Sequence, residues 1–177
     1  MSGPPPGLRF GLLTCSSTRT PADDASGDAL QAGVLAAGGT VACRSLLPDD
    51  RGAIAALLRE WADGGRVDVV LTTGGTGLGP RDVTPEATAD VGERSVPGLA
   101  ELLRLRGLER TPFSALSRGA AWLRGRTLIV NLPGSPGAVR EGLEVLLPLL
   151  PHAAAIAAGG GHPPARVVDF TQGAPLS

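Results

Sequence analysis

The sequence contains no lysine and no tyrosine, and all sixteen of its basic residues are arginine. The absence of lysine excludes a P-loop lysine, Schiff-base chemistry with a cofactor aldehyde, and lysine nucleophiles in general. If the protein binds phosphate, arginine side chains and backbone N–H groups must bind it.

Cysteine and histidine are also scarce, with two residues of each. Cys15 and Cys43 lie in or at the end of apolar runs and have no CxxC spacing, which favours buried thiols over a disulfide or a metal site. His152 and His162 are too few for a metal site built mainly from histidine.

Long apolar runs and a large net charge are absent as well. No run approaches the roughly 20 residues that a membrane span needs. The N-terminal sequence MSGPPPG lacks the basic flank and apolar core of a secretory signal. A formal charge of −1 gives no overall field to attract nucleic acid, although arginines could still cluster locally. We therefore expect a soluble, cytoplasmic protein that binds neither membranes nor nucleic acid.

Hydrophobic patterning predicts one domain over residues 8–158, between a flexible N-terminal tail, 1–7, and a C-terminal tail, 159–177. Apolar runs predict strands over 8–14, 40–47, 67–71 and 126–131. Helical spacing predicts helices over 27–37, 51–63, 85–91, 98–108, 136–147 and 152–158, and the stretch 111–123 shows no clear pattern. Strands that alternate with helices predict an α/β fold with a mostly parallel sheet covered on both faces.

In such a fold, ligands bind at the carboxyl ends of the strands. The loop after the third strand, TTGGTGLGPRDVTPEAT, is rich in glycine and leads into a helix that we expect to begin with Thr84 as N-cap and Pro85 behind it. It matches neither a dinucleotide fingerprint, which follows the first strand, nor a P-loop, which needs lysine. A tight turn with a helix cap would also explain these glycines.

A second loop after the strand at 126–131 has the same plan, with Ser135 as N-cap and Pro136 in the first helical position. Each helix start offers roughly half a positive charge and several unpaired N–H donors. Two such helix starts at one cleft suit an anion with more than one phosphate.

Two aspartates also lie at strand ends. Asp82 belongs to the glycine-rich loop, and Asp49 follows the second strand. These carboxylates could hold a divalent cation among phosphate oxygens or accept a proton. Alternatively, Asp49 or Asp50 is a simple N-cap of the helix at 51–63, and Arg81 with Asp82 is an ordinary surface ion pair. Similarly, Ser16, Ser17 and Arg19 either line the exit of the first strand or belong to a solvated loop.

Three motifs together, TTGGTGLGPRDVTPEAT, NLPGSPGAVRE and LLPDDR, make the chain resemble the molybdopterin-binding family of molybdenum cofactor biosynthesis. The likeness is to the single-domain Mog/MoaB group, which is similar to domains of molybdenum insertases and gephyrin-like fusions. It covers about residues 8–157. The resemblance implies a three-layer α/β/α sandwich, a homotrimer or homohexamer, and a molybdenum insertase as a candidate partner.

The resemblance also implies a reaction: AMP passes from Mg-ATP to the terminal phosphate of molybdopterin, and pyrophosphate is released. The family's catalytic aspartates fall on Asp82 and Asp49, either of which is a candidate Mg²⁺ ligand. The implied substrate-binding residues are Ser16, Thr73, Gly74, Gly75, Thr76, Gly77, Pro133, Gly134 and Ser135. A further family aspartate corresponds loosely to Asp24.

Two other functions stay open at this point. One is a MoaB-like molybdopterin carrier or assembly protein with little or no adenylylation activity. The other is a regulatory module that recognises a nucleotide. The intact RDVTP motif favours the enzyme, whereas LLPDDR and the tail after Gly159 resemble MoaB-like members.

Overall fold

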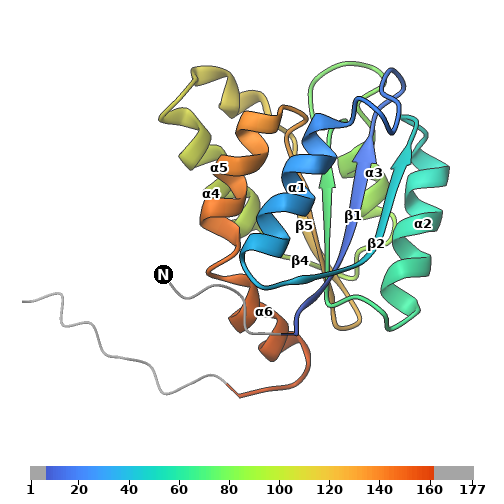
Figure 1. Cartoon of the computed structure of the whole chain (residues 1–177), viewed down its shortest axis with the longest axis vertical. Coiled ribbons are helices and arrows are strands. Elements are labelled where there is room, and N and C mark those ends of the chain that lie inside the picture. Colours follow the sequence, from blue (N-terminus) through green and yellow to red (C-terminus); the bar gives the residue numbers. More distant parts are fainter. Residues whose placement is uncertain (1–6, 162–177) are drawn as a thin grey trace, which may run out of the picture.

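The four apolar runs form the parallel part of a six-stranded sheet (Figure 1). In the computed structural model, which describes residues 7–161, the strand order is β2-β1-β3-β6-β5-β4. The parallel strands are β1 (Arg9–Cys15), β2 (Thr40–Leu47), β3 (Val69–Thr73) and β6 (Thr127–Leu132). Two short antiparallel strands, β4 (Arg94–Ser95) and β5 (Ala121–Arg124), extend the sheet beyond β6. The α/β class with a mostly parallel sheet is therefore confirmed.

Helices cover both faces of this sheet (Figure 1). One face packs against α1 (Ala25–Ala36), α4 (Pro97–Leu108), α5 (Pro136–Leu146) and α6 (Leu150–Ala157). The other packs against α2 (Arg51–Asp63) and α3 (Thr84–Ala89). A short 3-10 helix, η1 (Pro112–Leu116), follows α4. The sheet and its two helical layers form the three-layer sandwich.

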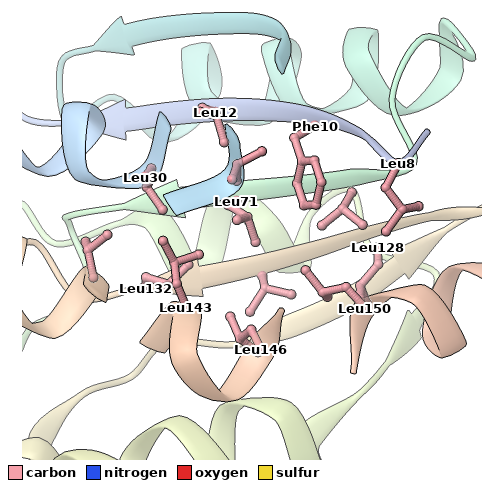
Figure 2. Close-up of a cluster of buried hydrophobic side chains, with 14 of the residues drawn as sticks. Leu8, Phe10, Leu12, Leu30, Leu71, Leu128, Leu132, Leu143, Leu146 and Leu150 are labelled. Atoms are coloured by element: carbon pink, nitrogen blue, oxygen red, sulfur yellow. The ribbon is translucent and has the colours of Figure 1, made fainter. Parts of the chain in front are cut away.

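Alternating residues of the central strands divide between two cores. In β1, Phe10 and Leu12 join the core beneath α1 and α5, whereas Leu13 joins the core beneath α2. Figure 2 shows the first of these cores, where Leu30 of α1 and Leu143 of α5 lie on the same side of the sheet. Because successive strand residues point to opposite faces, a strand buried on both faces has a continuous apolar sequence.

Most predicted boundaries lie within a few residues of the observed ones, and α2 occupies the predicted range 51–63. The stretch 111–123, which shows no clear pattern, contains η1 and most of β5. Neither β5 nor β4 is evident in the sequence, because each is short and partly exposed and their pairing depends on the hairpin to β6. Gly125 forms the turn of that hairpin with a φ of +54°.

The predicted tail at 159–177 begins after α6, and its part beyond residue 161 lies outside the described residues, as do residues 1–6. Across 7–161, none of the helices combines the length and apolar character needed to cross a membrane.

Candidate functional site

Two consecutive glycines turn the chain sharply at the end of β3. Gly74 has a φ of +93° and Gly75 a φ of +66°, which is backbone that L side chains rarely adopt. A Cβ atom at Gly74 would lie 2.3 Å from the Cys15 carbonyl oxygen, and one at Gly75 would lie 2.2 Å from Thr84 Oγ1. Both positions therefore require glycine, for backbone conformation and for space.

The structure brings the two predicted phosphate loops side by side. The Thr73 hydroxyl donates to the Pro133 carbonyl at 2.7 Å, and the Gly74 N–H donates to the Leu132 carbonyl at 3.2 Å. The approach is so close that a Cβ atom at Gly134 would lie 3.2 Å from Gly74 Cα. These contacts follow from the pairing of β3 with β6, because neighbouring parallel strands end at the same edge.

The second loop ends as predicted. Ser135 is the N-cap of α5, and its hydroxyl accepts the Ala138 N–H at 3.2 Å. Pro136 occupies the first position of the helix. Since Gly134, directly before this N-cap, approaches Gly74, α5 begins beside the glycine loop.

The first helix start differs from the prediction. Val83, not Thr84, occupies the N-cap position of α3, and its side chain accepts no hydrogen bond. Thr84 lies inside the first turn and is fully buried. Its Oγ1 has no partner at normal hydrogen-bond geometry among residues 7–161, although the neighbouring Cys15 thiol is close enough for this hydroxyl to oppose the rise in thiol pKa that burial causes. The Thr-Pro-Glu pattern is misleading here because a contact across the loop fixes the position of Thr84. Its N–H donates to the Gly75 carbonyl at 3.1 Å, so Thr84 lies beneath Gly75.

Asp49 and Asp50 have separate roles. Asp50 is the N-cap of α2 and accepts the Ala53 N–H at 2.7 Å. Asp49 instead accepts two hydrogen bonds on Oδ2, from the N–H of Ser17 at 2.9 Å and from its hydroxyl at 2.7 Å. Its Oδ1 lies 3.4 Å from where a Cβ atom of Gly75 would stand. Asp49 is thus held against the glycine loop.

Asp82 lies at the other end of the same loop. Its Oδ2 accepts the Gly79 N–H at 2.8 Å, and its own N–H donates to the Gly79 carbonyl at 3.0 Å. The carboxylate also lies 2.9 Å from where a Cβ atom of Gly77 would stand. Arg81 beside it is exposed. Both predicted catalytic aspartates therefore face the glycine loop.

Arg118 also contacts this loop and was not predicted from the sequence. Its guanidinium donates to the carbonyls of Gly77 and Asp82 and to the carboxylate of Glu86. The bond to Arg118 is the main reason that the pKa of Glu86 lies below its ordinary value. Arg118 belongs to the stretch without a clear pattern, so nothing local in the sequence indicates where its side chain lies.

The first loop, after β1, joins the site through Arg19. Its guanidinium donates to the Gly134 carbonyl at 2.8 Å and to the Ser26 hydroxyl. Asp24, which is 2% exposed, is the N-cap of α1 and pairs with Arg44 at 3.0 Å. Ser16 accepts N–H groups of its own loop, so its hydroxyl shapes that turn.

A cavity of about 470 Å³ opens beside the two loops, between the glycine loop, α4, η1 and α5. Four predicted binding residues line it: Thr76, Gly77, Pro133 and Ser135. The rest of the wall includes apolar side chains, two arginines, a glutamate and three hydroxyl side chains: Leu78, Leu103, Phe113, Leu116, Arg106, Arg110, Glu141, Thr111, Ser114 and Ser117. A mostly apolar cavity with a few polar groups is typical of a site for a small organic ligand.

The donor atoms fit Mg²⁺ shared with a substrate. Asp49 Oδ1 and the unpartnered Thr84 Oγ1 both flank Gly75. Mg²⁺ prefers oxygen ligands and is commonly held by one or two carboxylates together with substrate phosphates. No group of three His, Cys, Asp or Glu side chains within 7–161 could hold a metal by itself. The protein atoms therefore fit a metal that arrives with its phosphates.

Cys15 lies beneath the same loop but is unsuited to chemistry. Burial raises the pKa of its thiol to about 12, so it is protonated at neutral pH.

Comparison with solved structures agrees with this architecture. The chain is 50% identical to the molybdopterin biosynthesis enzyme MoaB from Thermus thermophilus, with a TM-score of 0.79 over 86% of this chain and 97% of that one. It is 38% identical to the molybdopterin biosynthesis Mog protein from Mycobacterium ulcerans, with a TM-score of 0.79 over 86% and 98% of the two chains.

Among curated sequences, a molybdopterin adenylyltransferase of Helicobacter pylori is 43% identical over 107 residues, which are 60% of this chain and 61% of that protein. The chain spans between a quarter and about three fifths of the length of the first curated relatives that it matches.

The family model described as "Probable molybdopterin binding domain" matches residues 11–152, a range that contains both glycine-rich loops, both aspartates and Arg118. The relatives named above carry names from molybdopterin synthesis, in agreement with the sequence motifs. This chain therefore belongs to the molybdopterin-binding domain family of molybdenum cofactor biosynthesis.

Proposed function

We propose that this protein is a molybdopterin adenylyltransferase, which transfers AMP from Mg-ATP to the terminal phosphate of molybdopterin. The observation that carries the proposal is the placement of Asp49 and Asp82 against one glycine loop, which also lines a cavity large enough for an organic substrate. The adenylyltransferase name of a 43% identical relative supports it.

In the proposed reaction, an oxygen of the terminal molybdopterin phosphate attacks the α-phosphorus of ATP. A new P–O bond forms, the bond between the α-phosphorus and the bridging oxygen to the β-phosphate breaks, and pyrophosphate leaves with the electron pair. Nucleotidyl transfer of this kind depends mainly on positioning and on charge stabilisation, so lysine and histidine are not needed.

Each part of the site has a role in this proposal. Backbone N–H groups of the glycine loop and of the α5 start bind phosphate oxygens. Asp82 helps to position the metal or the attacking phosphate, since its carboxylate is already fixed by the Gly79 N–H. Asp49 and Thr84 would hold Mg²⁺, which offsets the negative charge that develops on the phosphates. The cavity walls receive the pterin.

Mixing the pure protein with molybdopterin, Mg-ATP and pyrophosphatase tests the proposal by the appearance of adenylylated molybdopterin. The Asp82→Asn variant, which keeps the shape of the side chain and removes its charge, should lose at least about 10²-fold in kcat while keeping its fold. Wild-type protein that binds molybdopterin tightly but yields no product would be a carrier or assembly protein, the second candidate, which the MoaB-like motif LLPDDR favours.

We also propose a homotrimer or homohexamer as the working assembly, with a molybdenum insertase as its partner. Large apolar side chains are exposed on α4 away from the cavity, among them Leu105 at 63% and Leu108 at 45%. Exposed apolar surface of this kind is typical of protein interfaces. Size-exclusion chromatography with light scattering distinguishes a monomer, a trimer and a hexamer.

A further inference from the structure

Arg118 lies between η1 and β5, outside the glycine loop, yet it contacts that loop at three points and helix α3 behind it at a fourth. Its main-chain N–H donates to the Thr76 carbonyl at 2.9 Å, and its Nε donates to the Gly77 carbonyl at 2.7 Å. One terminal nitrogen donates to the Asp82 carbonyl and the other to the carboxylate of Glu86. A single residue thus spans the loop from its first turn to the helix behind it.

The value of these contacts lies in their geometry. Because the Arg118 side chain is 34% exposed, its ion pair with Glu86 adds little stability by charge alone. A guanidinium is planar, is always charged and presents its donors in a rigid fork, so three simultaneous bonds fix the relative positions of their three acceptors. A lysine ammonium at this position could not reproduce that pattern.

The bond to the Asp82 carbonyl is the important one. Asp82 is held on its side chain by the Gly79 N–H and on its main chain by Arg118, so its carboxylate has one defined position relative to the loop. Two of the residues whose carbonyls accept hydrogen bonds from Arg118, Thr76 and Gly77, also line the cavity. The same residue therefore connects the cavity wall with the aspartate.

We infer that Arg118 is a positioning residue that holds the loop 76–82 in the shape in which Asp82 aligns the attacking phosphate. The inference rests on the proposed function and adds to it a residue outside the two phosphate loops. Arg118 acts through Asp82 and the loop backbone, so its loss should affect the chemical step more than substrate binding. A misplacement of about 1 Å can reduce a rate by about 10²-fold.

Arg118→Lys tests the inference, with Arg124→Lys as its matched control. Arg124 ends β5 and also binds a carboxylate, that of Asp63, and a backbone carbonyl, that of Val91, but it does not contact the glycine loop. Arg118→Lys should lower kcat by about 10- to 100-fold and leave the KM for molybdopterin within about threefold. Arg124→Lys should change both constants by less than about twofold.

A second measurement does not depend on activity. Amide hydrogen exchange across residues 76–82 should accelerate in Arg118→Lys and stay at the wild-type rate in Arg124→Lys, because only the first variant releases the loop. Glu86→Gln leaves both hydrogen bonds from Arg118 to the loop carbonyls in place, so it should lower kcat less than Arg118→Lys does. The double variant should lower kcat by a factor smaller than the product of the two single factors, because the two side chains contact each other.

The inference is overturned if Arg118→Lys keeps the wild-type kcat, even with faster exchange, or if both lysine variants lower kcat equally. A wild-type protein without transfer activity would overturn the proposed function first. The exchange comparison would then still decide whether Arg118 holds the loop.

Discussion

Ser17 and Asp49 bind each other in both directions: the Ser17 hydroxyl donates to Asp49 Oδ2 at 2.7 Å, and the Asp49 N–H donates to Ser17 Oγ at 3.0 Å. The Ser17 N–H adds a third bond to the same carboxylate oxygen. Oδ2 is therefore occupied by protein donors, and Oδ1 is left on the side of Gly75. Ser17 decides which oxygen of Asp49 faces the site.

Ser17→Ala should therefore weaken the site without unfolding it. The variant keeps the hydrogen bond from its main-chain N–H to Asp49 but loses the one from the hydroxyl. A hydrogen bond to a charged group contributes at least about 1.5 kcal/mol, so kcat/KM should fall by about tenfold. Steady-state transfer assays measure the loss. Thr18→Ala, one residue along the same exposed loop, is the control and should match wild type; equal activity of Ser17→Ala would contradict the role.

Gly75→Ala should destabilise the protein by about 1 to 3 kcal/mol, because the backbone lies in the left-handed region and the new Cβ would collide with the buried Thr84 hydroxyl. Urea unfolding measures the change. Gly137→Ala is the matched control, since a Cβ atom there meets nothing within 4 Å and the residue lies in α5. The free energy of unfolding of Gly137→Ala should rise by about 0.5 to 1 kcal/mol. If Gly75→Ala had the wild-type free energy of unfolding, the turn would have to shift its backbone enough to accommodate the new Cβ atom, which would contradict the prediction.

The Glu86 and Arg118 pair should make stability depend on pH in the acid range. Hydrogen bonding to Arg118 lowers the pKa of Glu86 in the folded protein from its ordinary value near 4.5. A lowered carboxyl pKa stabilises the fold above the ordinary value, and this contribution disappears as pH falls through the folded-state pKa. The stability difference between wild type and Glu86→Gln should therefore be largest at neutral pH and shrink below about pH 4. A constant difference from pH 7 to pH 3 would contradict this contribution.

Cys15 and Cys43 should differ in reactivity. Cys15 is 2% exposed and its thiol pKa is raised to about 12, whereas Cys43 is only partly buried and its pKa is raised less far. Since the thiolate is the reactive form, a thiol reagent at pH 8 should modify Cys43 first and Cys15 only after denaturant is added. Mass spectrometry of the labelled peptides identifies the modified residue. Equal labelling of both thiols in the native protein would show that the loop above Cys15 opens.

Local signals predicted the parallel strands and most of the helices. The apolar runs of β1, β3 and β6 are buried on both faces, and such burial leaves a continuous pattern along the chain. Asp50 and Ser135 act as the N-caps that their positions indicate, because capping depends on neighbours within three residues. Thr84 carries the same local signal but is drawn beneath Gly75 by a contact across the loop.

The two short antiparallel strands and the supporting charges could not be predicted in this way. The pairing of β4 with β5 joins residues that are far apart in the sequence, and neither strand has a pattern of its own. Asp24 and Arg118 resemble ordinary loop residues along the chain. Their partners, Arg44 for Asp24 and the glycine loop for Arg118, come from other elements of the fold.

The sequence by itself determined the fold class, the glycine loops, both aspartates and the family, because each depends on residue types at short, fixed spacing. Only the tertiary structure decided that Gly74 and Gly134 touch, that Asp49 presents Oδ1 to the loop, and that Arg118 holds the loop from outside. The physical reason is distance along the chain. These relationships join residues dozens of positions apart, and they form only when the parallel strands bring their carboxyl ends to one edge of the sheet.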